Sequence, residues 1–322
     1  MRAGQNPAKF IDEKPAQAER VTVAIITHIP SLHGYHAQSL DVLKVSLDSL
    51  LENTEPAYDL LIFDNASGTE TRQFLQSLYD AGQIDYLFLS AENIGKGKAW
   101  DFIFAAAPGD IVAYADSDVY FEAGWLIEGI RLLETFPRVG MLSCRPMRTY
   151  PEGHSATLEW VEDDSGAKLT VGTFVDWETF REHDVNLGQE ESQVRERYEN
   201  SEDVLIEYRG VQAYAGAAHW QFIAYKHVLG QFLPLGIERT LGDDRKLDDA
   251  LNQAGYLRLM TTAPLVRHLG NRVPDDMEPN GVDRSHKVDK DRSPGRRLLD
   301  WSPIRALLLA IYNRIFRWYF DR

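Results

Sequence analysis

Two carboxylates separated by a single residue form the most informative motif of the chain. Asp116 and Asp118, with Ser117 between them, directly follow the apolar run 111–115. Two carboxylates in this spacing can share a divalent cation with a diphosphate, because Mg²⁺ and Mn²⁺ prefer oxygen ligands and often keep substrate phosphates in their coordination shell. Surface turns also produce Asp-x-Asp by chance, so the motif gains its weight from its place after a predicted buried strand.

A second polar segment, Asp64-Asn65-Ala66-Ser67, follows the apolar run 60–63. In a functional interpretation, the Asp64 carboxylate binds a nucleotide base or ribose. In the alternative interpretation, the segment is a strand-to-helix turn with an Asx or Ser cap, which these residue types favour. The two interpretations are compatible, because Ser67 can cap the turn while Asp64 binds a ligand.

A third segment combines glycines and lysines over residues 93–98, Asn-Ile-Gly-Lys-Gly-Lys. Gly95 and Gly97 allow close approach of the backbone, and a helix start presents free N–H groups to an anion. Lys96 or Lys98 would then reach a phosphate. The alternative is a solvated helix start, and the glycine spacing matches neither the dinucleotide fingerprint nor the P-loop.

Alternating strands and helices must position these three segments. Short β-branched and apolar runs predict strands, and apolar residues at helical spacing predict helices between them. The predicted strands are 21–27, 60–63, 86–89, 111–115 and 139–144, and the predicted helices are about 40–51, 69–79, 96–106 and 125–135. Later in the chain, 247–254 reads as a helix and 257–266 as a strand. This order predicts an α/β fold with a mostly parallel sheet, and ligands bind at the carboxyl ends of such strands.

Composition narrows the classes of function. The 322 residues include 34 Lys and Arg against 49 Asp and Glu, a net charge of −15, which disfavours a nucleic-acid partner because phosphate backbones require a basic face. The single cysteine, Cys144, allows no intrachain disulfide, fits a reducing compartment and reads as an inert core thiol. Residues 1–20 do not resemble a signal peptide, and no apolar run approaches the ~18–20 residues of a membrane span.

The charge is unevenly distributed along the chain. Residues 284–322 carry ten Lys and Arg against four Asp, a net charge of +6, so the other 283 residues carry −21. Residues 159–207 contain fifteen acids and four bases. Part of this acidic stretch, 189–200, reads as a solvated helix, and another part as a flexible lid.

The order and spacing of these motifs resemble glycosyltransferase family 2, with its GT-A fold, and in particular its rhamnosyltransferase-like branch. The resemblance is carried by residues 21–27, 49–51, 64–67, Asn93-x-Gly95, 116–119, 124–126 and 136–140 in the first half of the chain. In the second half it is carried by 216–218, 230–232, Asp243-Asp244 and His268. The chain departs from the family pattern at Asp243, Lys246 and Ala250, where Glu, Asp and Arg are usual.

The resemblance implies an α/β, Rossmann-like GT-A enzyme that uses Mn²⁺ or Mg²⁺. Such an enzyme moves a sugar, with inversion, from a UDP, GDP or dTDP sugar to an acceptor hydroxyl of a glycan, a lipid-linked acceptor or a polysaccharide precursor. The implied metal ligands are Asp116, Asp118 and His268. The implied nucleotide-sugar residues are Thr27, Asp64, Asn65, Asn93, Gly95, Lys98, Asp116 and Ser117. Asp244, with Asp243 beside it, is the implied base, and His219 and Trp220 lie on the acceptor side.

Under this resemblance the chain divides into five segments. They are a mobile leader (1–20), a nucleotide-sugar-binding half (21–145), an acidic insertion or lid (146–211), an acceptor-side half (212–283) and a basic amphipathic tail (284–322). Asp243-Asp244 has an alternative interpretation as an N-cap before the helix at Leu247. The spacing of His28, His33 and His36 weakly suggests a zinc site. This interpretation is disfavoured because no cysteine or acidic partner completes a tetrahedral set.

Three other functions stay open at this stage. A retaining GT-A enzyme would not need Asp244 as a base. A sugar-1-phosphate nucleotidyltransferase would carry a glycine-rich loop after the first strand, which is absent here. A catalytically silent, membrane-associated binding or scaffold protein is suggested only by Lys246 and Ala250.

The tail has the pattern of an interfacial helix. Ser302-Pro303 is a good helix start, and the apolar residues between 304 and 320 share one side, flanked by Arg305, Arg314 and Arg317. The alternatives are docking onto the protein's own core and a homodimer contact. We expect a cytoplasmic enzyme that lies peripherally at the inner face of the cell membrane, bound through anionic lipids.

Overall fold

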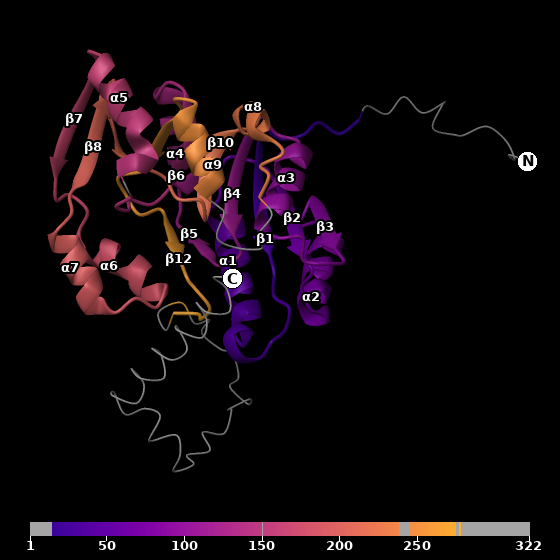
Figure 1. Cartoon of the computed structure of the whole chain (residues 1–322). Helices are drawn as coiled ribbons and strands as arrows, with labels where there is room; N and C mark the ends of the chain where they lie inside the picture. Colours follow the sequence, from indigo (N-terminus) through magenta and orange to yellow (C-terminus); the bar gives the residue numbers. More distant parts are fainter. Residues whose placement is uncertain (1–14, 150, 238–244, 275–276, 278–322) are drawn as a thin grey trace, which may run out of the picture. The chain divides into compact units, whose positions relative to one another are not determined.

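The computed structural model describes residues 15–149, 151–237, 245–274 and 277 (Figure 1). Its centre is a ten-stranded sheet in the order β3-β2-β1-β4-β10-β6-β11-β9-β8-β7, and β5 and β12 form a separate pair. The strands are β1 (Val21–Thr27), β2 (Asp59–Asn65), β3 (Tyr86–Ser90), β4 (Ile111–Asp116), β5 (Val119–Phe121), β6 (Val139–Ser143), β7 (Ala167–Gly172), β8 (Asp203–Tyr208), β9 (Val211–Ala215), β10 (Gln221–Tyr225), β11 (Leu257–Met260) and β12 (Val266–His268).

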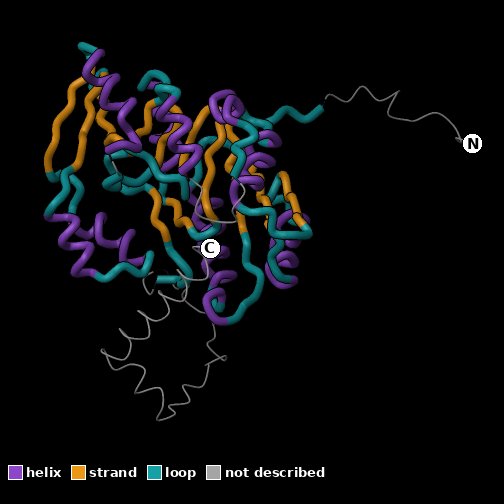
Figure 2. Tube along the Cα trace, in the orientation of Figure 1, coloured by secondary structure: helices purple, strands orange, loops and turns teal. Residues whose placement is uncertain are grey.

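Helices cover both faces of the sheet (Figure 2). Alternate residues of β1 point to opposite sides: Val23 and Ile25 join the core under α1 and α4, whereas Ala24 and Ile26 join the core under α3 and α9. The helices are α1 (Ser39–Asn53), α2 (Thr69–Asp80), α3 (Lys96–Ala106), α4 (Trp125–Thr135), α5 (Ser155–Asp163), α6 (Trp177–Asn186), α7 (Glu191–Glu199), α8 (Lys226–Leu229) and α9 (Arg245–Gln253), with short 3-10 turns at Gly34–His36, Pro151–His154 and Gly230–Phe232.

The predicted α/β fold is confirmed, and the sheet has two different halves. Strands β3, β2, β1 and β4 are parallel neighbours, as the βαβ order predicts. In the second half β6 and β11 are parallel, and the other neighbours are antiparallel. The register of the parallel half pairs Thr27 with Asp64 and Ile26 with Asp116, so the predicted donor-side residues meet at one edge.

The prediction of one strand over 257–266 is wrong. The chain forms β11 and β12, which belong to different sheets, with the Pro264-containing segment 261–265 between them. This segment leaves the ladder while still bonded to its neighbour: Thr261 N–H donates to the Ser143 carbonyl, and Leu265 N–H donates to the Cys144 carbonyl. The break lets β12 pair with β5, which places His268 opposite Val119.

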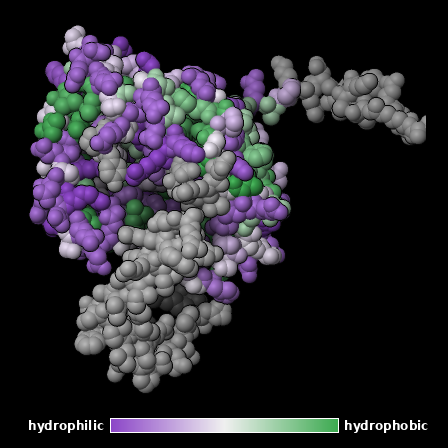
Figure 3. All heavy atoms as spheres, viewed as in Figure 1, coloured by the Kyte–Doolittle hydropathy of each residue, from purple (hydrophilic) through white to green (hydrophobic). Residues whose placement is uncertain are grey.

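The acidic segment 146–211 extends the central sheet. Strands β7 and β8 pair with each other, and β8 pairs with β9. The helix predicted within 189–200 is confirmed as α7, whose only buried residue is Val194. Helices α6 and α7 close a third, small core that includes Val175, Phe180 and Val194. Exposed apolar residues gather on the two edge strands, β3 and β7, and both places are green in Figure 3.

Several predictions lie outside the described residues. They are most of the leader (1–14), the Asp243-Asp244 pair and the tail from 278 onward. Among the helices that are described, none is both long enough and apolar enough to span a bilayer. Cys144 is fully buried, and burial raises the pKa of its thiol, as expected of an inert core residue.

Candidate functional site

The structure brings together Asp118 and His268, two of the three predicted metal ligands. Pairing of β12 with β5 places His268 Nε2 3.4 Å from Asp118 Oδ2. Desolvation by burial raises the pKa of the Asp118 carboxyl and Asp116 raises it further, whereas His268 and Lys96 lower it. A divalent cation would favour the ionised carboxylate and so offset the cost of its burial.

The residues at this position fit a Mg²⁺ or Mn²⁺ ion. Asp118 Oδ1 is buried and has no hydrogen-bond partner among the described residues. The 3.4 Å between the carboxylate and the imidazole is close to the about 3 Å that separates neighbouring ligands of an octahedral ion with bonds of about 2.1 Å. The described part of the chain contains no cluster of three or more His, Cys, Asp or Glu side chains suited to a metal. Such ions are often held by one or two protein ligands together with substrate phosphates.

Asp116 does not join this pair. Its Oδ1 accepts a 2.5 Å hydrogen bond from the Tyr114 hydroxyl, and its Oδ2 accepts one of 2.8 Å from Lys96 Nζ. Asp116 is therefore oriented toward the donor side, next to half-buried Ser117, and its role as a metal ligand stays a prediction. Tyr114 was missed, although residues two apart on a strand share a face and the spacing was visible in the sequence.

Lys96, rather than Lys98, contacts the acidic motif. Gly95 has φ +80°, a left-handed conformation that glycine adopts without strain, and α3 begins at the next residue. Lys96 Nζ therefore reaches Asp116 and lies 5.2 Å from the centre of the Trp100 ring. Lys98 is two residues further, about 200° around the helix axis, and is exposed.

An asparagine and histidine network joins the ends of β1, β2 and the loop before α3. Asn65 Nδ2 donates to Asn93 Oδ1 at 3.0 Å, and Asn65 Oδ1 accepts from Ile94 N–H at 2.9 Å. His28 Nδ1 lies 2.6 Å from the Asn65 carbonyl and Nε2 lies 3.2 Å from Asn93 Nδ2, so the network requires a hydrogen on Nδ1 and an acceptor at Nε2. The predicted pair Asn65 and Asn93 therefore meets, and His28 joins it.

Asp64 and Thr27 lie at this edge but are covered. The Asp64 side chain is fully buried, accepts from Arg72 Nε at 3.0 Å and accepts from Ser67 N–H at 3.3 Å. Asp64 thus fixes the turn before α2, as the alternative interpretation predicts, and its contact with a base stays a prediction. Thr27 is 1% exposed, and its hydroxyl has no hydrogen-bond partner among the described residues.

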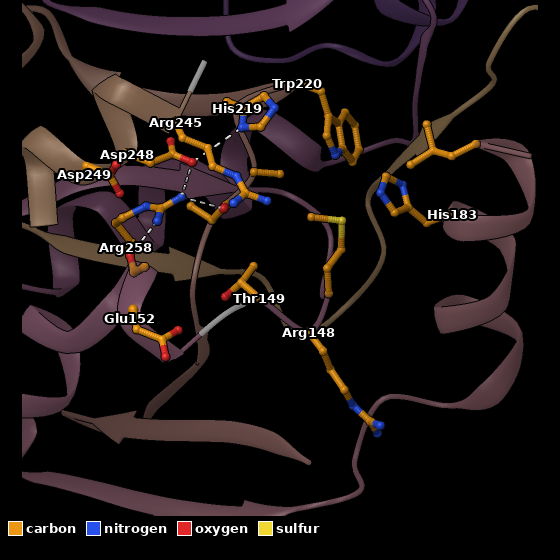
Figure 4. Close-up of a pocket in the computed structure, with 15 residues that line it drawn as sticks. Arg148, Thr149, Glu152, His183, His219, Trp220, Arg245, Asp248, Asp249 and Arg258 are labelled. Carbon is orange, nitrogen blue, oxygen red and sulfur yellow. Dashed lines mark hydrogen bonds and ion pairs between the residues drawn. The ribbon is translucent and has the colours of Figure 1, made fainter. Parts of the chain in front are cut away.

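A cavity of about 500 Å³ lies on the predicted acceptor side (Figure 4). His219 and Trp220, the two residues predicted on the acceptor side, both line it, together with Asp248 and Asp249 of α9. Asp248 accepts from the buried Arg258 at 2.9 Å and lies 3.4 Å from His219 Nδ1. These contacts join α9 to β11 and to the loop between β9 and β10. Its Oδ1 is buried and has no hydrogen-bond partner among the described residues. The composition of the cavity, with donors and acceptors around an indole, suits the hydroxyls and apolar face of a sugar.

His183 of α6 lines the same cavity and was not predicted. Its ring stacks on Trp220 at 5.5 Å between centres and meets His268 edge-on at 5.8 Å. Burial, reinforced by His268, lowers the pKa of His183 to about 3, so the ring is neutral near neutral pH. No motif in the acidic stretch distinguishes His183 as a residue that lines the cavity.

The predicted base cannot be placed, because Asp243 and Asp244 lie outside the described residues. The disfavoured zinc interpretation gains nothing from His33 and His36, since the described residues supply no three-ligand cluster around them. Burial and the neighbouring His28 lower the pKa of His36.

Residues 35–184 match the family model described as Glycosyl transferase family 2. Over these residues the chain is similar to glycosyl transferase family 2. No curated protein matches the chain.

Three solved structures have similar folds. TarS of S. aureus (residues 1–349) is 13% identical, with a TM-score of 0.45 over 78% of this chain and 60% of that one. The mannosyltransferase PcManGT from Pyrobaculum calidifontis, in complex with GDP-Man and Mn²⁺, is 19% identical, with a TM-score of 0.43 over 77% and 55%. GalNAc-T7 with UDP, GalNAc and Mn²⁺ is 12% identical, with a TM-score of 0.49 over 78% and 44%. The chain thus spans about half the length of these structures.

Proposed function

We propose that the protein is a metal-dependent, inverting glycosyltransferase that moves a sugar from a nucleoside diphosphate sugar to an acceptor hydroxyl. The observation that carries the proposal is the Asp118–His268 pair, which lies at the carboxyl edge of the sheet within reach of both halves of the site. On one side Asp116 links it to Lys96 and α3. On the other side Trp220 contacts His268 at 5.4 Å between ring centres and lines the cavity.

The donor side supplies binding groups for a nucleotide. The His28, Asn65 and Asn93 network presents side-chain amides and an imidazole at the end of β1 and β2. The amino terminus of α3, eleven residues long, has a positive dipole end that favours a diphosphate. Lys96 offsets the charge of Asp116, so the diphosphate meets one uncompensated carboxylate fewer at this edge.

Asp118 and His268 would hold the cation. When bound, Mn²⁺ or Mg²⁺ acts as a Lewis acid that stabilises the charge developing on the leaving diphosphate. The protein's contribution is to hold the Asp118 carboxylate and the imidazole Nε2 of His268 close together, at 3.4 Å. The two ligands come from different segments joined by the β5–β12 ladder, so their separation depends on that pairing.

The acceptor binds in the cavity beside Trp220. A sugar hydroxyl is a poor nucleophile and needs a proton acceptor within hydrogen-bond reach. The family resemblance assigns this role to Asp244, with Asp243 adjacent, at the amino-terminal side of α9. Asp248 and Asp249 of the same helix line the cavity and can accept hydrogen bonds that orient the acceptor. Attack from this side, opposite the leaving diphosphate, gives inversion.

Replacement of one ligand tests the proposal. We expect Asp118→Asn to lower sugar transfer by at least about a hundredfold, because it removes the charge that holds the cation. Asp163→Asn, at an exposed end of α5, is the matched control and should leave transfer unchanged. Activity is measured with UDP, GDP and dTDP sugars, with and without Mn²⁺, and the anomeric configuration of the product is read by NMR. Full activity of Asp118→Asn would contradict the metal site, and a retained configuration would contradict inversion.

For the tail, we propose peripheral binding to an anionic membrane surface. Its support is the net charge of +6 over residues 284–322 and the apolar side of residues 304–320.

A further inference from the structure

Helix α6 of the acidic segment contacts Arg267 and His268 of β12, and it reaches Val266 through the buried Arg145. Glu182 Oε1 accepts from Arg267 at 2.6–2.7 Å. The other oxygen of Glu182 accepts at 2.8 Å from the buried Arg145, which also donates to the Val266 carbonyl at 3.1 Å. Asn186 Nδ2 donates to the His268 carbonyl at 2.8 Å. The backbone of β12 is therefore bonded to β5 on one side and to α6 on the other.

The imidazole of His268 is held by rings as well. His183 of α6 meets it edge-on at 5.8 Å between centres, with an angle of 86°. Trp220 also meets it edge-on, at 5.4 Å and 83°, and His183 stacks on Trp220. Only 11% of the His268 side chain is exposed, and its Nε2 is the nitrogen that faces Asp118. The two rings leave His268 little freedom to rotate away.

We propose that α6 is the positioning element of the metal site, with Asn186 fixing the backbone of His268 and His183 fixing the orientation of its ring. This inference rests on the proposed function, since it takes Asp118 and His268 as the ligands. Groups that orient a metal ligand from behind typically change metal affinity 10- to 100-fold when they are replaced. The acidic segment then acts on the donor side of the site through α6.

The first test measures Mn²⁺ binding to the full chain with UDP present, by electron paramagnetic resonance of free Mn²⁺. We expect Asn186→Ala to weaken binding about 10-fold or more. Asn200→Ala is the matched control, because Asn200 also donates its amide to a carbonyl, that of Glu196 in α7, at 2.7 Å. The control should stay within twofold of the wild type. Equal affinities of Asn186→Ala and the wild type would overturn the proposal.

A pair of substitutions at His183 separates packing from coordination. His183→Phe keeps a flat ring against Trp220 and His268, so it should retain Mn²⁺ affinity, whereas His183→Ala should lose about 10-fold or more. If the phenylalanine variant loses as much as the alanine variant, the imidazole nitrogens themselves act, and the positioning role of His183 is wrong.

A measurement without metal distinguishes this inference from the proposed function. Nitrogen-15 correlation spectra of the histidine rings report the tautomer and order of His268 in the metal-free protein. We expect the His268 signals to shift or broaden in Asn186→Ala but not in Asn200→Ala. Unchanged signals would overturn the inference even if Mn²⁺ binds. Absence of Mn²⁺ binding by the wild type would instead refute the metal site while the spectra still decide the role of α6.

Discussion

Arg148 and Asp203 form a buried ion pair whose loss should release the acidic segment. The two side chains are 5% and 2% exposed, with Arg148 Nε 2.7 Å from Asp203 Oδ1. Arg148 also donates to the carbonyls of Tyr198 and Ser201, at the end of α7. Asp203 Oδ2 accepts from the backbone N–H groups of residues 174 and 175, before α6. This pair therefore joins both ends of the α6–α7 region to the residues that follow β6.

Arg148→Met isolates the electrostatic part of this arrangement. Methionine keeps an unbranched apolar chain against the rings of Phe180 and Tyr198, whose centres lie 5.0 and 4.5 Å from the guanidinium carbon. It leaves the Asp203 carboxylate buried without a cation, and breaking a buried pair in this way costs about 3–5 kcal/mol. That is a large share of the about 5–15 kcal/mol that stabilises a typical domain.

The assay is urea denaturation followed by circular dichroism, with hydrogen exchange to locate the change. Lys168→Met is the control, because Lys168 pairs with Glu207 in the same segment at 3.7 Å with 78% and 44% of the side chains exposed. Such an exposed pair contributes at most about 1 kcal/mol. We expect Arg148→Met to lower the free energy of unfolding by about 3 kcal/mol or more, with faster exchange in α6 and α7. A loss no greater than that of Lys168→Met would refute the reasoning.

Two further predictions concern pH and the tail. Burial, with a smaller effect of Arg258, lowers the pKa of His154 to about 4, so between about pH 6.5 and 4 the unfolded chain binds a proton at this residue and the folded chain does not. The free energy of unfolding should therefore fall by up to about 3 kcal/mol on acidification through this window. In denaturation curves measured at several pH values, His154→Gln should reduce this fall, and the exposed His33→Gln is the control. The full chain should float with vesicles that contain anionic phosphatidylserine, and a chain that ends at Asp300 should not. Equal flotation of the two chains would contradict a membrane role for the helix predicted from Ser302.

The parallel half of the sheet was predictable because its signals are local. Runs such as 21–27 are β-branched and apolar, and the helices between them repeat with a clear period. Once the strands are known to be parallel, their carboxyl ends must meet, which places Thr27, Asp64 and Asp116 at one edge. The structure confirms this placement through the register of β1 with β2 and β4.

The metal pair was predictable only through the family resemblance. Asp118 and His268 are 150 positions apart, and no periodicity relates them. Contacts between distant segments also explain the misassigned strand 257–266. Its two parts pair with different strands, since β11 pairs with β6 and β9, and β12 pairs with β5. Pro264 was a local sign of the break, since proline interrupts a strand ladder.

The buried arginines were not predictable from residue type. Arg145 and Arg258 are 1% and 3% exposed, although arginine is rarely buried unless it is paired. Each lies on or just after an interior strand and is paired with an acid from a helix, Glu182 or Asp248. For Arg145 the excess of acids over bases in 159–207 was a hint, because it left carboxylates such as Glu182 available for arginines elsewhere in the chain.

Ion pairs also reduce the charge that the acidic stretch 159–207 presents to the site. Its most buried acids, Asp184 and Asp203, contact Arg197 and Arg148, and so they add little to the field at the site. The exposed acids are not neutralised in this way. Residues 1–283, with a net charge of −21, therefore repel a diphosphate within the Debye length of about 8–10 Å. Because Lys96 is itself bound to Asp116, this pair offers a diphosphate no net positive charge. A divalent cation at Asp118 and His268 would supply that charge, so the composition of the chain is itself an argument for metal dependence.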